Sequence, residues 1–414
     1  MMYHKIVLLF SILVPLLVSC HRAGDGSLSD PMERVAVQMD LMYENAREAG
    51  TGSGSTTGDK PGMIPLTISA AGELKLAGPS NWCSGFYPGM LWLMSDLTGD
   101  PKWKSRAREY TGMVEEMQYD PTTHDIGFIM LCSHGNGFRI TGDEQYRDVL
   151  VRSAKTLATR FNSTVGCTRS WDWGKDRWQF PVIIDNMMNL ELLFWATGET
   201  GDSSYYHMAR THALTTMKNH FRDDYSTFHV VDYDTITGDV IARETFQGYS
   251  DESCWARGEA WGLYGYTLTY RYTREPRFLE QAEGIAGFIL NHPKLPEDMV
   301  TYWDFDAPGI PGEPRDASAA AITASALLEL STLASEGEPY RQAAFRIMES
   351  LGSADYSCAP GTRAGFILDH SVGHFRANPG VNDPLIYADY YYLEALSRMR
   401  RISRGEPVTG TGER

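Results

Sequence analysis

Two aspartates lie where a carboxyl group could do acid–base chemistry. Asp125 stands in the phrase H-D-I-G-F, and Asp185 follows the four largely apolar residues P-V-I-I and precedes an apolar helix. Burial and a neighbouring negative charge both raise the pKa of a carboxyl group, which keeps an acid protonated near neutral pH. A single Asp at the start of a helix is more often an N-cap, and the sequence does not show that these two aspartates face each other.

Four irregular phrases rich in aromatic and charged residues separate the helical stretches. They begin at Asn81 (N-W-C-S-G-F-Y-P-G), Thr123 (T-H-D-I-G-F), Arg169 (R-S-W-D-W-G-K-D-R-W) and Ser253 (S-C-W-A-R-G-E-A-W-G). Indole rings stack on the apolar faces of sugars, whose hydroxyl groups hydrogen-bond to charged side chains, so this composition suits a sugar-binding site. Half or more of the tryptophans could instead pack helices together. These tryptophans are Trp82, Trp171, Trp173, Trp178, Trp255 and Trp261.

Arg257 and His229 could supply positive charge in otherwise acidic surroundings. Arg257 and Trp261 are four residues apart and would share one face of a helix, where a guanidinium fork and a stacking plane suit a sugar carboxylate. His229, in F-H-V-V-D-Y-D, could equally be a hydrogen-bonded histidine of a strand or loop with no role in binding.

Signatures of metal, nucleophile and nucleotide chemistry are weak or absent. The phrase D-H-S-V-G-H from Asp369 places two histidines four residues apart, but Gly373 between them and the missing Glu argue against a zincin-type helix. The sequence has no G-x-S-x-G, P-loop or G-x-G-x-x-G phrase. Acyl transfer, phosphate chemistry and nicotinamide chemistry therefore lack support.

The composition is that of a globular protein with an acidic surface. Of 414 residues, 43% are hydrophobic and 22% charged, and 37 Lys and Arg against 53 Asp and Glu give a net charge of −16. Neutralising phosphates requires a basic face, so the composition argues against nucleic-acid binding and against attraction to an anionic membrane. Five cysteines follow Cys20 without a C-x-x-C phrase, which argues against zinc-ribbon and thioredoxin-like sites.

The N-terminus is predicted to be a targeting segment. Lys5 precedes thirteen mostly apolar residues (6–18), which are too few to span a bilayer and are typical of a signal peptide. The phrase L-V-S-C that ends at Cys20 resembles a bacterial lipoprotein box. We therefore expect removal of residues 1–19 and lipid attachment at Cys20. The resulting protein would be periplasmic and would contact a membrane, expected to be the outer membrane, only through its lipid. An uncleaved apolar N-terminus is the alternative.

The rest of the chain divides into an N-terminal extension, one long domain and a tail. Residues 20–62 are expected to hold the lipid tether, a first helix at 31–48 and a flexible Gly/Ser/Thr-rich loop at 49–59. No linker interrupts residues 63–401, which we expect to form a single catalytic barrel. Residues 402–414 are expected to be a disordered tail.

One turn phrase recurs through this domain and predicts its fold. T-G-D-P-K-W, T-G-D-E-Q-Y and T-G-D-S-S-Y start at Thr98, Thr141 and Thr200, and degenerate copies start at Thr273 and Glu336. In each full copy the Gly would end one helix, the acidic residue would begin the next, and the aromatic residue would start its buried face. Helical hairpins at this spacing, with few strands, predict an all-α fold, an (α/α)6 barrel whose inner-helix N-termini line one open end. An open solenoid of the same hairpins is the alternative.

Taken in order, these phrases resemble the unsaturated glucuronyl hydrolases of glycoside hydrolase family 88. The resemblance runs from about Trp82 to Arg398 and implies an (α/α)6 barrel that acts without metal or cofactor. The implied substrate is an oligosaccharide that a polysaccharide lyase has left with a C4=C5 unsaturated uronic acid at its non-reducing end. The phrases that carry the resemblance are W-C-S-G-F-Y-P-G, H-D-I-G-F, R-S-W-D-W-G, I-I-D-N-M-M-N, H-V-V-D-Y, Q-G-Y-S-D-E-S-C-W-A-R-G-E-A-W, Y-W-D-F-D-A-P, R-D-A-S-A-A-A and L-I-Y-A-D-Y-Y-Y-L-E-A.

The resemblance also implies roles for individual residues. Asp185 matches the general acid/base, and Asp125 matches a second essential carboxylate that would raise the pKa of Asp185. In the implied reaction, protonated Asp185 delivers a proton to C4, and its carboxylate then activates the water that attacks C5. Arg257 or His229 would bind the uronate carboxylate. The positions that match substrate contacts are Trp82, His124, His229, Gln247, Arg257, Trp261 and one of Trp171 and Trp173.

We expect chondroitin or hyaluronan disaccharides as substrates, ahead of heparin-derived or algal ones. Family members that prefer sulfated units often carry a Ser/Lys-containing motif in a late loop. The corresponding phrase here, H-S-V-G-H-F-R-A-N-P-G-V-N-D, has Arg376 as its only strong cation and resembles that motif poorly. An unsaturated rhamnogalacturonyl hydrolase and a non-catalytic, lipid-anchored glycan-binding protein are the two alternatives.

Overall fold

The computed structural model describes residues 31–52, 63–377 and 380–409. The predicted signal peptide, Cys20 and the lipid tether lie outside the described residues, as do residues 53–59 of the predicted flexible loop. Within the described ranges, no helix is long and apolar enough to cross a membrane.

The turns between helices follow the recurring phrase of the sequence. Gly99, Gly142 and Gly201 each end a helix in the left-handed conformation, with φ between 66° and 73°, which glycine adopts without steric cost. The aspartate after each glycine caps the next helix, because its carboxylate accepts a hydrogen bond from the backbone N–H two residues further on, at 2.9–3.1 Å. In the degenerate copy that starts at Thr273, Arg274 takes the left-handed position and Glu275 makes no capping bond.

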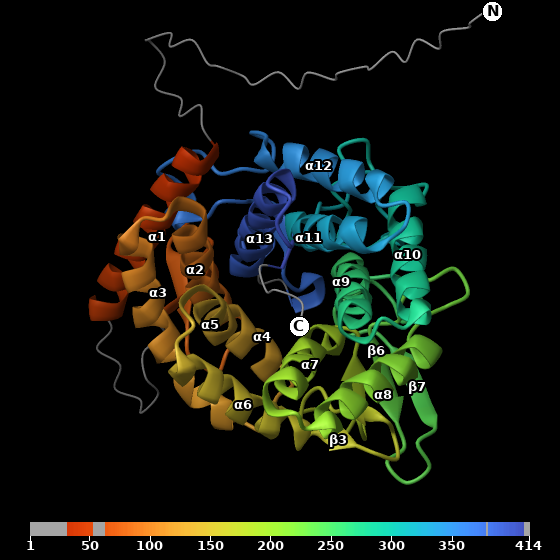
Figure 1. The fold of residues 1–414 in the computed structure, drawn as a ribbon. Helices are drawn as coiled ribbons and strands as arrows, with labels where there is room; N and C mark the ends of the chain where they lie inside the picture. Colours follow the sequence, from red (N-terminus) through yellow and green to blue (C-terminus); the bar gives the residue numbers. More distant parts are fainter. Residues whose placement is uncertain (1–30, 53–62, 378–379, 410–414) are drawn as a thin grey trace, which may run out of the picture.

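Six inner helical segments alternate along the described chain with six outer helices (Figure 1). One inner segment is composite, with a π-helical stretch η2 (Leu131–Gly135) joining two α-helices. The inner segments are α2 (Phe86–Thr98), α4 (Ile126–Met130) with η2 and α5 (Asn136–Thr141), α7 (Asn186–Thr200), α9 (Ala256–Thr273), α11 (Ala317–Leu333) and α13 (Ile386–Ser403). The outer helices are α1 (Pro31–Gly52), α3 (Pro101–Met113), α6 (Glu144–Ala158), α8 (Ser203–Asn219), α10 (Pro276–Asn291) and α12 (Glu338–Gly352).

The inner segments close into a ring. Helix α11 packs against α9 and α13, α7 packs against α9 and α4, and α2 packs against α13 on one side and η2 on the other. Figure 1 shows the chain travelling once around this ring, with the outer helices outside it. The predicted all-α (α/α)6 barrel is therefore confirmed, and the open solenoid is excluded.

The position of each helix follows from its side chains. Helix α11 is rich in Ala and Leu, and every residue from Ala317 to Leu330 is buried, because neighbours surround an inner helix. Outer helix α10 instead buries a stripe that includes Phe278, Ala282, Ile285 and Ile289 and exposes its opposite face. These patterns place the apolar core between the two rings.

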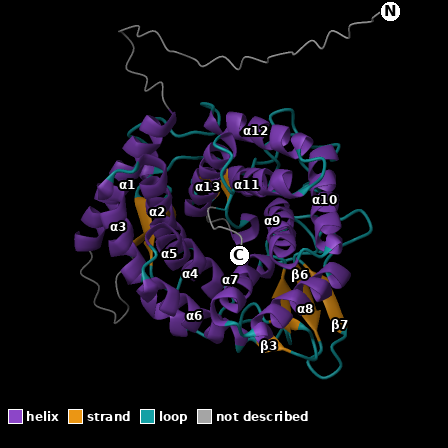
Figure 2. Cartoon of the chain, in the orientation of Figure 1, coloured by secondary structure: helices purple, strands orange, loops and turns teal. Residues whose placement is uncertain are grey.

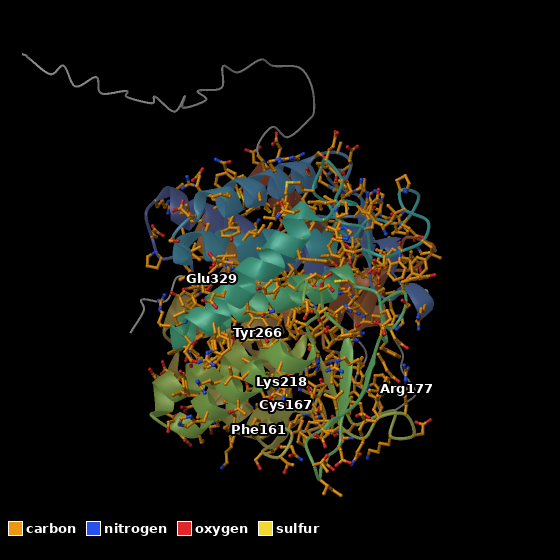
Figure 3. The ribbon with its side chains drawn as sticks, turned by 90° about the vertical axis from the view of Figure 1, so that its right-hand side faces the viewer. Phe161, Cys167, Arg177, Lys218, Tyr266 and Glu329 are labelled. Carbon is orange, nitrogen blue, oxygen red and sulfur yellow. The ribbon has the colours of Figure 1, made fainter. Side chains whose placement is uncertain are left out.

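Short antiparallel strands join the loops at one end of the barrel. Each described strand falls between an outer helix and the next inner helix, so all of them lie where inner helices begin (Figure 2). Arg177, from the loops at this end, and Glu329, from the C-terminal part of α11, lie toward opposite sides of the molecule in Figure 3. The strands are β1 (Ile64–Ile68), β2 (Leu74–Ala77), β3 (Phe161–Asn162), β4 (Cys167–Thr168), β5 (Pro181–Ile183), β6 (Val230–Tyr233), β7 (Val240–Glu244), β8 (Ser371–Val372) and β9 (Val381–Asp383).

Two predicted boundaries differ from the structure. Helix α1 continues to Gly52, beyond the expected end at residue 48. The expected tail from residue 402 is wrong for its first part, since α13 runs to Ser403 and Val408 is buried. Val408 lines a cavity at one end of the barrel, and burial of its apolar side chain there favours an ordered position for this segment. Residues 410–414 of the predicted tail lie outside the described residues.

Candidate active site

Asp185 is a buried acid at the start of an inner helix. It immediately precedes α7 but makes no side-chain capping bond, so the N-cap interpretation does not hold. Its side chain is 11% exposed, and no hydrogen-bond partner for its Oδ2 atom exists among the described residues. The pKa of Asp185 is raised to about 7, mainly by burial, with the charge of Asp125 acting in the same direction and Arg257 and Trp261 in the opposite direction. Such a carboxyl group can hold a proton at neutral pH and then give it up.

Asp125 faces the same site from α4, which packs against α7. It makes no capping bond to α4. Instead, its Oδ2 accepts a hydrogen bond from Thr123 Oγ1 at 2.8 Å, and its Oδ1 lies 3.3 Å from Nε2 of His124. Because Asp125 contributes to the raised pKa of Asp185, the structure brings together the two carboxyl groups that the sequence could not pair.

His229 is a neutral hydrogen-bond donor rather than a cation. Its Nδ1 atom accepts hydrogen bonds from the backbone N–H groups of Phe246 at 3.0 Å and Gln247 at 3.1 Å, so its proton must be on Nε2. Nε2 lies 3.8 Å from Oδ2 of Asp185. Burial, with the charge of Arg257 second, lowers the pKa of His229 well below its ordinary value. The expectation of positive charge at His229 is therefore wrong at neutral pH.

Arg257 holds a loop beside the site. It is 1% exposed, its Nη2 donates to the carbonyl of Gly373 at 2.6 Å, and its Nη1 donates to the carbonyl of Val372 and pairs with Asp316 at 3.3 Å. Gln247 Nε2 also donates to the Gly373 carbonyl, at 3.2 Å. Arg257 and Gln247, both predicted to contact substrate, thus donate to the same carbonyl group. The guanidinium group of Arg257, which was expected to be available for a sugar carboxylate, already binds protein groups.

Aromatic residues line and support the site. Trp261 is fully buried on α9, four residues after Arg257 as predicted, and contacts Phe128 at a ring distance of 5.1 Å. Trp82 is partly buried and packs on Tyr387 and Phe128, at 5.0 and 5.7 Å. Phe128 therefore contacts both tryptophans and joins them in one aromatic cluster.

Trp171 and Trp173 have different environments. Their rings stack at 4.5 Å with 13° between the planes, but Trp171 is 9% exposed and Trp173 is 49% exposed. Trp171 also forms an isolated β-bridge to Thr123, which connects two of the predicted loops. Trp178 and Trp255 are buried, so part of the predicted tryptophan set does pack the fold. Trp173 is the member with a free stacking face.

Four residues that shape the site were not singled out as site residues from the sequence. Asn189 lies one turn after Asp185 on α7, and its place in I-I-D-N-M-M-N, at a spacing of four, could have indicated it. Asp316, Val372 and Tyr387 come from distant segments, and nothing in their own phrases connects them to Asp185. Among the described residues, no group of three His, Cys, Asp or Glu side chains is arranged to hold a metal ion.

A separate cavity of about 1030 Å³ lies at the other end of the barrel. It contains neither aspartate of the site, and its lining includes the C-terminal parts of α7, α9 and α13. Its charged side chains are largely paired, as Arg271 is with Glu191 and Glu329. It does not provide the arrangement of acid and hydrogen-bond donors described above.

Comparison with known proteins shows the family of this chain. The model of Glycosyl Hydrolase Family 88 matches residues 67–353. An unsaturated glucuronyl hydrolase of Formosa agariphila is 49% identical over 341 residues, which cover 82% of this chain and 85% of the relative. An unsaturated chondroitin disaccharide hydrolase of Streptococcus pneumoniae is 34% identical, with 77% of this chain and 82% of the relative covered.

A solved structure shows the same fold. The crystal structure of an unsaturated glucuronyl hydrolase specific for heparin is 46% identical to this chain and superposes with a TM-score of 0.84, covering 91% of this chain and 98% of the other. Family match, sequence identity and fold thus agree over most of the chain, as the resemblance of the motifs predicts. The chain belongs to glycoside hydrolase family 88 and is an enzyme of that family.

Proposed function

We propose that this enzyme removes the 4,5-unsaturated glucuronic acid from the non-reducing end of glycosaminoglycan oligosaccharides. The observation that carries the proposal is the environment of Asp185, a buried carboxyl group with a pKa raised to about 7 and an Oδ2 atom that no described residue satisfies. The names of the relatives support the class of substrate. A protonated acid aimed into a site is what addition of a proton to a C4=C5 double bond requires.

The proposed reaction is hydration of a vinyl ether. Protonated Asp185 gives its proton to C4, the π electrons of C4=C5 form the new C–H bond, and positive charge develops at C5 and the ring oxygen. The Asp185 carboxylate then takes a proton from water as the water oxygen bonds to C5. The hemiketal opens by breaking the bond between C5 and the ring oxygen, and the hemiacetal left at C1 releases the remaining sugar. No nucleophile attacks C1, so the distance between the two carboxyl groups does not predict retention or inversion of configuration at C1.

The neighbouring groups support this reaction in distinct ways. Asp125 adds to the effect of burial in raising the pKa of Asp185. The Nε2–H of His229 is an uncommitted donor beside Asp185 and can bind an oxygen of the substrate. Arg257 acts through the Val372–Gly373 backbone that it holds, and its charge favours the carboxylate form of Asp185 once the proton has left.

Two glycosaminoglycan classes are candidates for the preferred substrate. The sequence resemblance favours chondroitin or hyaluronan disaccharides, while the late loop, which resembles the Ser/Lys motif poorly, assigns no sulfation preference. The 46% identity to the heparin-specific enzyme favours heparin-derived disaccharides as the second candidate. Arg376, the cation of the late loop, donates to the Tyr249 carbonyl at 2.6 Å, so part of its hydrogen-bonding capacity is already used.

An absorbance assay tests the proposal. Protein lacking residues 1–20 is mixed with unsaturated chondroitin, hyaluronan and heparin disaccharides, and loss of the ultraviolet absorbance of the conjugated double bond is followed. Loss on any of them supports hydration, and the relative rates rank the substrates. A folded protein that leaves all three unchanged but consumes a pectin-derived unsaturated disaccharide would instead be a rhamnogalacturonyl hydrolase.

We also propose that the enzyme is a periplasmic lipoprotein attached through Cys20. The support is the short apolar segment at residues 6–18 followed by L-V-S-C. Full-length protein expressed with labelled fatty acid in a Gram-negative host should incorporate the label and fractionate with membranes. Cys20→Ser should lose both properties, and retention of label by this variant would contradict the proposal.

A further inference from the structure

A chain of close polar contacts connects α7, which begins just after Asp185, to Asp125, which immediately precedes α4. Asn189 is fully buried on α7, and its Oδ1 atom accepts the backbone N–H of Phe128 at 2.8 Å. Its Nδ2 atom lies 3.4 Å from Nδ1 of His124. Nε2 of His124 lies 3.3 Å from Oδ1 of Asp125. One amide therefore contacts both the α4 backbone and the histidine that touches Asp125.

The packing of the two helices leaves the Asn189 side chain little freedom. Gly127 lies opposite it, and a Cβ atom at that position would come within 2.4 Å of Asn189 Oδ1 and 2.6 Å of Asn189 Cα. Only an oxygen can accept the N–H of Phe128, so this contact also fixes which way round the amide sits. The amide NH₂ group is thus directed at His124.

This orientation determines the tautomer of His124. An NH₂ group donates, so Nδ1 of His124 must accept and the ring proton must be on Nε2. Nε2 then carries its proton 3.3 Å from Oδ1 of Asp125. Burial lowers the pKa of His124, so the ring is neutral and a single proton has to be placed correctly.

We propose that Asn189 is a positioning residue that fixes the Nε2–H tautomer of His124, and thereby places this proton beside the carboxyl group of Asp125. The charged groups that act on His124 are Asp125, which favours its protonation, and Arg160, which opposes it. The groups that act on Asp185 are Arg257 and Asp125, with His229 within 3.8 Å. The consequence for turnover rests on the proposed function, whereas the tautomer does not.

Asn189→Asp tests the assignment with a side chain of nearly the same shape. One carboxylate oxygen can still accept the N–H of Phe128, but the other cannot donate to Nδ1 of His124. Nδ1 must then carry a proton, either in the reversed tautomer or in the imidazolium, whenever the introduced carboxyl group is ionised. Carbon-13 NMR of the aspartate-labelled variant shows whether it is ionised, because a protonated carboxyl group would donate to Nδ1 as the amide does. Nitrogen-15 NMR of histidine-labelled protein distinguishes these states, and the spectrum of His124→Gln identifies the His124 signals. We expect Nε2–H in the unmodified enzyme and a protonated Nδ1 in Asn189→Asp.

Kinetics provide the second readout, with Asn136→Asp as the matched control. Asn136 lies on α5 at the other end of the barrel, where it hydrogen-bonds Cys132 and Tyr390. Asn189→Asp should lower kcat by roughly 10- to 100-fold with little change in KM, because a misplaced carboxylate mainly affects the transition state. It should also displace the alkaline limb of the pH profile, and the control should do neither.

Specific results would overturn the proposal. These are an Nδ1–H tautomer of His124 in the unmodified enzyme, or an Asn189→Asp variant whose introduced carboxyl group is ionised and whose His124 signals and pH profile are unchanged. The first of these does not depend on Asn189→Asp, so it decides the question even if that variant does not fold. If the enzyme turned over no unsaturated disaccharide while the tautomer changed as expected, the proposed function would fail and the role of Asn189 in placing the proton would stand.

Discussion

Nε2 of His229 lies 3.8 Å from Oδ2 of Asp185, and neither atom has a hydrogen-bond partner among the described residues. The two atoms are too far apart to satisfy each other fully, yet both are buried. Unsatisfied buried polar atoms are costly unless a ligand or water completes them. A donor and an acid that converge in this way mark the place where a substrate oxygen and the reacting carbon would lie.

Asp185→Asn should abolish turnover while leaving substrate binding intact. An amide cannot deliver a proton to carbon, but it preserves the shape of the carboxyl group. We expect kcat to fall by roughly 10²- to 10⁴-fold and the dissociation constant, measured by calorimetry on the variant, to change little. A variant with a rate near that of the unmodified enzyme would remove Asp185 from the proton-transfer step.

Asp125→Asn should move the alkaline limb of the pH profile to lower pH. Activity requires protonated Asp185, whose pKa is about 7, so the rate should fall as pH rises through that value. Ionised Asp125 raises this pKa, and a neutral amide removes the effect, so the protonated fraction at pH 7 should decrease. The measurement is kcat/KM from pH 5 to 9 for both proteins, and a limb displaced toward higher pH would contradict the expected sign.

Arg257→Lys should loosen the backbone of Val372 and Gly373 without removing the positive charge. A lysine ammonium is a point donor and cannot bridge two carbonyl groups and Asp316 as the guanidinium does. We expect faster amide hydrogen exchange in residues 371–374 and a decrease in kcat/KM of roughly 10- to 100-fold. If exchange in this segment stayed unchanged, Arg257 would act on substrate directly rather than through the loop.

Substitution of Trp173 should affect substrate binding, whereas substitution of Trp171 should affect stability. Trp173→Ala removes an exposed ring and should raise KM by roughly 2- to 10-fold, with little change in the free energy of unfolding. Trp171→Ala removes a buried ring and should lower that free energy by about 3 kcal/mol. Steady-state kinetics and denaturant titration of both variants check this division, which would be wrong if Trp173→Ala were the more destabilising change.

Much of the fold could be read from the sequence because its signals are local. A glycine that ends a helix and an aspartate that caps the next act within a few residues, as at Gly99, Gly142 and Gly201. The apolar surroundings of Asp185 likewise come from its own segment, so its burial was predictable. The motif order identified the family for the same reason, since each phrase is a short stretch of chain.

Only the tertiary structure decided which residues of the site contact each other. The carbonyl of Gly373 that Arg257 binds is 116 residues away in sequence, and the Asn189 amide that faces His124 is 65 residues away. Such contacts depend on how the ring of helices closes, and no local pattern contains them. The charge of His229 was mispredicted for the same reason, because its burial and the two backbone N–H groups that fix its proton come from separate segments. The sequence by itself determined which residue types and helices are present, while the closure of the barrel determined their protonation states and partners.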